Sequence, residues 1–274
     1  MKLEVEGESI EAHSEGGIET CIQLPARDLA FDIGRCPPGA ERVSQLFLTH
    51  AHIDHAAGLP YYVSLRSMLG MPPPTVYCPA ESQPTLQAIL DLWAKLQADT
   101  DRVTLVGVSP GDEIAVKRGK MRVFRAPHRI AAVGYTLWQT RRHLRADLVG
   151  TPPNEIARLA AAGHDVSTTT EEPIISFPGD TRAALLDTEP SVMKARILLL
   201  ECTFVGPDVD AEKASRSGHI HLDQIAERAN RFENKALVLT HFSRRYGRRH
   251  IEKAVRDKLP DELFARTRLL IHHD

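Results

Sequence analysis

The sequence has few cysteines, few aromatic residues and no long apolar run. Its four cysteines (Cys21, Cys36, Cys78 and Cys202) lie far apart and form no CxxC pair, which argues against a zinc–thiolate knot or a disulfide framework. No apolar stretch reaches the roughly 18 residues that a membrane-spanning helix needs. Residues 1–20 hold six Glu against one Lys, the reverse of the charge of a signal or transit peptide. We therefore expect a cytoplasmic protein with reduced thiols and no membrane association.

An excess of positive charge is also lacking. The chain has 34 Lys and Arg against 36 Asp and Glu, a net charge of −2, which is not the balance of a protein that coats nucleic acid indiscriminately. Residues 242–258 depart from this balance, with seven Arg or Lys against Glu252 and Asp257. Arg141, Arg142 and Arg145 form a second basic group. The sequence therefore predicts a local basic face.

The 274 residues contain no repeat and no low-complexity segment, and their composition, 42% hydrophobic and 26% charged, is that of a globular protein. Short β-rich runs are expected at 21–24, 29–33, 46–49, 75–77, 103–108, 113–116, 121–125, 133–140, 174–177, 196–200, 236–240 and 267–271. Helices are expected at 59–69, 81–95, 154–162, 222–232 and 250–259. This pattern favours an α/β fold, an αββα sandwich with helices outside and sheets inside. We expect one domain, residues 1–274, with residues 141–173 as a short arm or insertion.

The densest group of reactive side chains lies in LFLTHAHIDHAAGLP, residues 46–60. An apolar β run ends at Thr49, and His50, His52, Asp54 and His55 follow at once. The carboxyl ends of strands are where α/β sheets place their sites. Side chains at i and i+2 of an extended backbone point the same way, so His50 and His52 can bind one metal ion. Adjacent side chains point apart, so the pair Asp54 and His55 can serve a neighbouring ion. The spacing therefore predicts two metals.

This HxHxDH segment resembles the signature of the metallo-β-lactamase superfamily. Four further elements of that superfamily are matched in order, one by Asp32 at the end of an earlier strand and three after the segment, by His128 in APH, Asp180 in PGD and His241 in LTH. The resemblance implies one ion held by His50, His52 and His128, a second held by Asp54, His55 and His241, and Asp180 between them. Asp32 is expected to orient a ligand; the alternative is an ordinary turn carboxylate. Nitrogen-rich ligands favour two Zn²⁺ ions, although Mn²⁺ or Fe²⁺ would also accept them.

The last third of the chain resembles ribonuclease Z, the endonuclease that trims the 3′ end of precursor tRNA. The matching segments are LECTF at 200–204, GHIH at 218–221 and THFSRRY at 240–246, and FDIGRCP at 31–37 is similar to the short, plant-type form. The usual HEAT and HST motifs are altered, because Leu200 and Cys202 replace His and Ala, and Ile220 and His221 follow His219. The resemblance implies Asp54, Glu201 and His219 as catalytic residues, with His219 as the leaving-group acid and Glu201 as its orienter. It assigns no role to His221.

The same resemblance implies precursor tRNA as substrate. An RNA-binding face beside the metals would consist of Arg244, Arg245, Tyr246, Arg248 and Arg249. The alternative is that these residues are only the solvent-exposed start of a helix. The long Gly-Pro-rich arm with which most ribonuclease Z enzymes grip tRNA is not evident, and only residues 141–176 could replace it. A homodimer is expected, with residues 59–69 either at its interface or in the core. The alternatives are a hydrolase of a small phosphodiester or ester, and a non-catalytic metal-binding protein.

Overall fold

A computed structural model describes residues 1–98 and 102–272. Its first sheet holds seven strands in chain order, antiparallel from β1 to β4 and parallel from β4 to β7. They are β1 (Lys2–Val5), β2 (Glu8–Glu15), β3 (Glu19–Leu24), β4 (Leu29–Phe31), β5 (Gln45–Phe47), β6 (Thr75–Pro79) and β7 (Thr104–Val108).

The second sheet repeats this plan with the strands that follow. It is antiparallel from β8 to β11 and parallel from β11 to β14. Its strands are β8 (Glu113–Val116), β9 (Gly119–Arg125), β10 (Val133–Leu144), β11 (Ser167–Phe177), β12 (Ile197–Glu201), β13 (Ala236–Thr240) and β14 (Thr267–Leu269).

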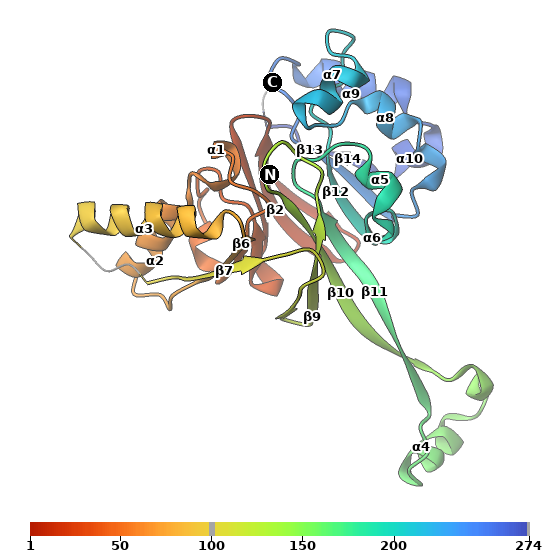
Figure 1. Ribbon diagram of the computed structural model, residues 1–274. Helices are drawn as coiled ribbons and strands as arrows, with labels where there is room; N and C mark the ends of the chain where they lie inside the picture. The colour runs from red at the N-terminus through yellow and green to blue at the C-terminus, as the bar shows by residue number, and fades with distance from the viewer. Residues whose placement is uncertain (99–101, 273–274) are drawn as a thin grey trace.

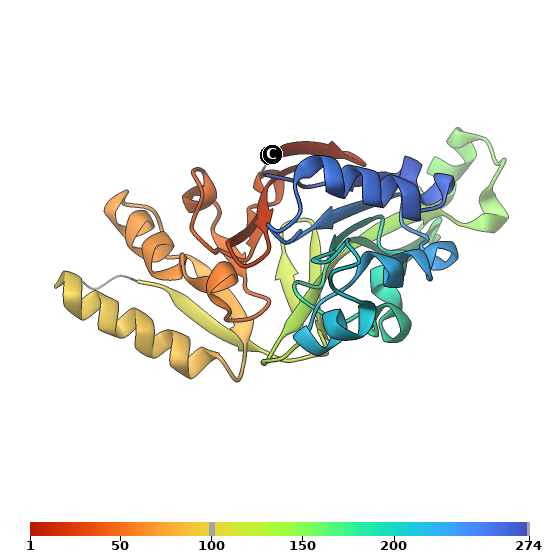
Figure 2. The ribbon, with the colours of Figure 1, turned by 90° about the horizontal axis from the view of Figure 1, so that it is seen from above.

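The two sheets pack face to face, and helices cover their outer faces (Figure 2). Alternation along the strands produces these layers, because successive side chains point to opposite faces. In β5, Leu46 packs toward the helices over the first sheet, whereas Phe47 packs between the sheets with Phe31 and Tyr135. The predicted αββα sandwich is confirmed.

Two long helices, α2 (Leu59–Met68) and α3 (Gln83–Gln97), cover the first sheet, and the helices of the C-terminal third cover the second (Figure 1). The other helices are α1 (Ile53–Ala56), α4 (Pro153–Ala161), α5 (Leu185–Thr188), α6 (Pro190–Lys194), α7 (Ala211–Ser217), α8 (Leu222–Ala226), α9 (Arg248–Lys258) and α10 (Asp261–Ala265). Short 3₁₀ turns are η1 (Pro25–Arg27), η2 (Ala40–Arg42), η3 (Ala146–Leu148) and η4 (Ala229–Arg231).

Three local expectations differ from the structure. The acidic N-terminal segment was not expected to form strands, yet it supplies β1 and β2. Glu11 and Glu15 take outward positions of β2, whereas Ile10 and Ala12 point inward, on the same face as Glu8, which pairs with Arg27. The helix expected over 222–232 ends at Ala226 and is followed by η4. The helix α7 was not predicted, because its seven residues, AEKASRS, include no large apolar side chain.

Residues 141–173 form an ordered projection. The strands β10 and β11 continue past the sheet as a two-stranded ribbon, paired as far as Leu144 and Ser167, and η3 and α4 lie at its tip (Figure 1). The distal parts of both strands are largely exposed, so both faces carry polar residues such as Arg142 and Thr169. Because apolar and polar residues do not alternate there, no strand is predicted for these distal parts.

Candidate metal centre and active site

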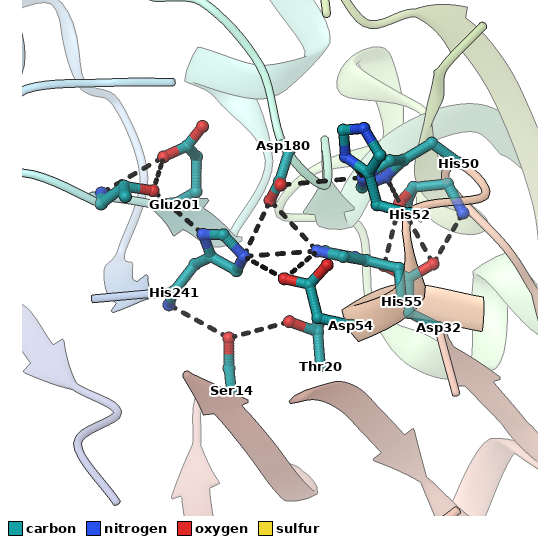
Figure 3. Close-up of polar contacts among 12 residues, drawn as sticks. Ser14, Thr20, Asp32, His50, His52, Asp54, His55, Asp180, Glu201 and His241 are labelled. Atoms are coloured by element: carbon teal, nitrogen blue, oxygen red, sulfur yellow. Dashed lines mark hydrogen bonds and ion pairs between the residues drawn. The ribbon is translucent and has the colours of Figure 1, made fainter. Parts of the chain in front are cut away.

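The predicted ligands meet because each comes after the end of a strand. Figure 3 shows all of them except His128. His50 comes just after β5, and α1 then presents Asp54 and His55. His128 lies between β9 and β10, Asp180 follows β11 and His241 follows β13. The structure thus brings together, from both sheets, all the side chains that the sequence suggested as metal ligands.

The first group contains His50, His52, His128 and Asp180. Nδ1 of His52 lies 3.1 Å from Nε2 of His50 and 3.2 Å from Nε2 of His128. Oδ2 of Asp180 lies 3.7 Å from Nε2 of His50. Three ring nitrogens and one carboxylate oxygen therefore converge on a single point.

The second group contains Asp54, His55 and His241. Nε2 of His241 lies 3.3 Å from Nε2 of His55 and 3.3 Å from Oδ2 of Asp54. Oδ1 of Asp180 lies 3.4 Å from Nε2 of each of the two histidines. Asp180 therefore points one oxygen at each group.

The opposite nitrogens of four of these rings, those of His50, His55, His128 and His241, are engaged, which fixes the tautomers of these rings when they are neutral. Nδ1–H of His55 donates to Asp32 at 2.8 Å, and Nδ1–H of His128 donates to the Gly218 carbonyl at 2.9 Å. Nδ1 of His50 lies 3.0 Å from the Thr49 hydroxyl, and Nδ1 of His241 lies 2.9 Å from the Thr203 hydroxyl. These hydroxyls donate their own protons to Asp32 and Glu201, so each accepts from the ring beside it.

In their neutral forms, which metal binding requires, His55 and His241 consequently turn the lone pairs of their Nε2 atoms toward each other, and two facing lone pairs do not form a hydrogen bond. A cation between them removes the conflict, and two nitrogens bound tetrahedrally to Zn²⁺ lie about 3.3 Å apart. The separations of 3.1 to 3.3 Å fit that distance. Oδ1 of Asp180 is buried with no hydrogen-bond partner among the described residues. The donor set therefore fits metal ions in both groups.

Burial and charge act on this cluster in opposite directions. Burial lowers the pKa of His50 well below its usual value, which favours the neutral ring that a metal ligand requires. Burial alone would also lower the pKa of His55, but the carboxylates of Asp180 and Asp32 raise it well above normal. For Asp180, burial alone would raise the pKa, and the surrounding histidines, His241 first, lower it well below normal. Asp180 is therefore a carboxylate in this site.

Glu201 and His219 lie beside the metal-binding groups. Nδ1 of His219 is 3.1 Å from Oε1 of Glu201 and 3.8 Å from Oδ2 of Asp180. Glu201 is 1% exposed and also accepts the backbone N–H of Thr181 and the Thr203 hydroxyl. Burial alone would lower the pKa of His219, but the negative charge of Glu201 raises it to about 9. The geometry therefore allows His219 to hold a proton next to the cluster.

Several contributors to the site were not predicted from the sequence. Asp32, which was expected to orient a ligand, also accepts the backbone N–H and hydroxyl of Thr49. Hydroxyls of Thr49 and Thr203 hold the outer nitrogens of two histidines, and Ser14 accepts the backbone N–H of His241 at 3.0 Å. In the sequence, Thr49 directly precedes His50 and Thr203 lies two residues after Glu201, whereas nothing near Ser14 points to the site.

His221, to which the sequence assigned no role, caps a helix. Its Nδ1 accepts the backbone N–H of Asp223 at the start of α8, and its Nε2–H donates to the Gly206 carbonyl at 3.1 Å. Gln224 completes the capping box by accepting the backbone N–H of His221. Both ring nitrogens are used, so His221 is a structural residue.

The basic residues after β13 are placed differently from the expectation. Tyr246 is 6% exposed, stacks on His250 and donates its hydroxyl to Asp208, so its ring has no open face for an RNA base. Arg245 also pairs with Asp208, at 2.9 Å. The other three members of the predicted set are Arg244, which pairs with Glu15, Arg248, which donates to the Ile271 carbonyl, and Arg249. Arg249 is exposed and has no ion-pair partner within residues 1–98 and 102–272.

Comparison with known proteins agrees with this geometry. Residues 27–242 match the model of the β-lactamase superfamily domain. The protein tRNase Z TRZ1 of Arabidopsis thaliana is 38% identical over 267 residues, which cover 96% of this chain and 95% of that protein. The chain belongs to the tRNase Z family. The resemblance to ribonuclease Z is thus confirmed, although the tRNase Z motifs at Leu200 and Cys202 are altered.

Other tRNase Z proteins extend the comparison. The chloroplastic tRNase Z TRZ2 of Arabidopsis thaliana is 33% identical over 256 residues, covering 92% of this chain and 72% of that protein. The crystal structure of human tRNase Z, short form, has the same fold, with a TM-score of 0.57 at 18% identity, and the match covers 86% of this chain and 93% of the human one. No helix in the described part of this tRNase Z family member is long and apolar enough to span a membrane.

Proposed function

We propose that the protein is a metal-dependent endoribonuclease that removes the 3′ trailer from precursor tRNA. The observation that carries this proposal is the Glu201–His219 pair, 3.1 Å apart, beside two groups of metal ligands in a chain of the tRNase Z family. Cleavage of RNA leaves a 3′ alkoxide, which needs a proton more than an activated leaving group does. An acid held next to the metal ligands supplies that proton.

Two Zn²⁺ ions are the proposed cofactors. His50, His52 and His128 would hold one ion, Asp54, His55 and His241 the other, and Asp180 would bridge them through its two oxygens. Bound zinc ions lower the pKa of a shared water and polarise the phosphate. Their nitrogen-rich ligands favour zinc over magnesium or calcium.

The chain's own residues orient the ligands and move the protons. Asp32 and Thr203 hold His55 and His241 with their Nε2 atoms facing inward. Asp54 is a carboxylate at the cluster, because hydrogen bonding to His241 and the charge of His55 lower its pKa despite its burial, and it would accept the proton of the attacking water. His219 would donate from Nε2 to the leaving 3′ oxygen, while Glu201 holds its Nδ1–H.

The second candidate function is hydrolysis of a small phosphodiester or ester, since the same centre can cleave activated substrates without an acid. The two functions are separated by offering zinc-loaded protein a 3′-extended precursor tRNA and, in parallel, bis(p-nitrophenyl) phosphate. We expect endonucleolytic release of the trailer together with slower turnover of the small ester. Turnover of the ester with no cleavage of any precursor tRNA would favour the second candidate.

The proposed assembly is a homodimer that uses α2. Leu59, Tyr62 and Val63 of this helix are buried in the protein's own core, so this face is not available to a partner. Tyr61 and Met68 are 57% and 76% exposed and would form the contact. Light scattering at micromolar concentration should give twice the chain mass of 30.4 kDa. A cytoplasmic location remains a prediction for cell fractionation to test.

A further inference from the structure

The N-terminal hairpin of β2 and β3 reaches the metal-ligand cluster from the far end of the chain (Figure 3). The backbone N–H of His241 donates to Oγ of Ser14 at 3.0 Å across 227 residues of sequence. Oγ of Ser14 lies 3.4 Å from the Thr20 hydroxyl in the paired strand. Either hydroxyl can donate in this second contact, and the two contacts together hold the Ser14 side chain between β3 and His241.

This contact meets a specific need of His241. The residue has φ 60, in the left-handed region that non-glycine residues rarely adopt. The residue lies just past the end of β13 and is only 3% exposed, so its backbone N–H is buried. A buried N–H without a partner is unfavourable, and a strained conformation persists only where its surroundings impose it. Ser14 supplies the partner.

The turn of the same hairpin makes two further contacts with the second ligand group. The backbone N–H of Gly17 donates to Oδ2 of Asp54, the oxygen that faces His241, at 2.8 Å. Gly16 donates to the Phe242 carbonyl at 3.1 Å, and a Cβ on Gly16 would lie only 2.9 Å from the carbonyl oxygen of His241. The hairpin thus packs directly on two of the three ligands in this group, and within the described residues it forms no hydrogen bond or ion pair with His52 or His128.

We propose that Ser14 is a positioning residue for His241, and that the hairpin selectively supports the ion held by Asp54, His55 and His241. This inference rests on the proposed dinuclear centre but not on the identity of the RNA substrate. A purely structural role would give a different result: loss of the hydroxyl would lower stability without favouring one ion over the other.

The test compares zinc binding to the apoproteins of wild type, Ser14→Ala and a control, Ser176→Ala. Ser176 is equally buried, and its hydroxyl bonds Thr136 at 3.0 Å and no ligand residue. Competition with a chromophoric chelator measures both zinc affinities, and thermal unfolding checks the fold. In Ser14→Ala we expect one affinity to be unchanged and the other about 10 to 100-fold weaker, whereas Ser176→Ala binds both ions like wild type.

Two further variants test whether the weakened zinc site is the one that contains His241. Gly16→Ala should reproduce the selective loss, because its methyl group displaces the hairpin from His241. In the background of His241→Ala, Ser14→Ala should have no further effect on zinc binding, because the ligand that it positions is already gone. Equal weakening of both ions, unchanged zinc binding or additive losses in the double variant would overturn the inference. Wild type that binds a single ion would overturn the dinuclear centre itself, so the two failures are distinguishable.

Discussion

The carboxylate of Asp32 lies 2.8 Å from Nδ1 of His55 and is completely buried. Its other oxygen accepts the backbone N–H of Thr49 at 2.7 Å. In Asp32→Asn, either His55 or the backbone N–H of Thr49 would face an NH₂ group and lose its acceptor. The left-handed backbone of residue 32 (φ 57) is retained, because asparagine adopts this conformation readily. We expect zinc affinity to fall about 10 to 100-fold, measured by chelator competition.

Asp28→Asn provides a matched control for this change. Asp28 has φ 56, nearly the same backbone conformation, and accepts hydrogen bonds from Ser44 far from the cluster. Zinc affinity should be unchanged in this variant. If both variants bind zinc equally well, Asp32 does not orient His55 in the way proposed.

The His219→Ala variant separates protonation from metal binding. Nδ1 of His219 is held by Glu201, so the ring is not needed as a ligand and both metals should remain bound. The rate of precursor tRNA cleavage should fall by about 10² to 10⁴-fold, and that of bis(p-nitrophenyl) phosphate far less, because p-nitrophenolate leaves without a proton. Loss of zinc would instead place His219 in the third possible ligand group, with Asp180 and His241.

The projection formed by β10 and β11 can be shortened without touching the core. None of the residues of α4 is buried, and Leu144 and Ser167 are paired at the base of the tip. Replacing residues 145–166 by an Asn-Gly turn should preserve the fold and the turnover of bis(p-nitrophenyl) phosphate. If this projection takes the place of the arm with which most ribonuclease Z enzymes grip tRNA, precursor tRNA should show a KM raised about tenfold, measured by steady-state cleavage. An unchanged KM would show that the projection does not contribute to tRNA binding.

Asp187 gives a prediction for the dependence of stability on pH. Hydrogen bonds from Arg228 and Arg231 lower the pKa of Asp187 to about 2, so its stabilising contribution is present above about pH 4 and is lost as the pH falls toward 2. Its side chain is 38% exposed, so solvent limits the contribution to about 0.5–1 kcal/mol. Asp187→Asn should therefore lower the free energy of unfolding at pH 7, and urea titrations should show the difference shrinking by pH 3.5. The 95% exposed Asp261, replaced by Asn, should show no comparable trend.

The metal ligands could be predicted from the sequence, but most of the residues that hold them in position could not. His50 to His55, Asp180 and His241 were found because each directly follows an apolar strand, a signal that is local in the sequence. Ser14 was missed because its partner is 227 residues away and no periodicity links them. Tyr246 was predicted to stack on an RNA base because basic residues flank it in the sequence. In the structure its ring packs on His250 instead. Burial of one aromatic ring depends on tertiary packing, which composition does not show.

The origin of the ligands in two different sheets has a consequence for folding. The first sheet supplies His50 through β5, and the second supplies Asp180 and His241 through β11 and β13. The first group is complete only when β11 is docked on the first sheet, and the second only when β13 is docked there as well. An ion bound there cross-links the two halves of the sandwich, and it stabilises the docked state in proportion to the logarithm of its free concentration. Metal occupancy in a refolding experiment would therefore report late assembly of the two halves rather than early collapse of either one.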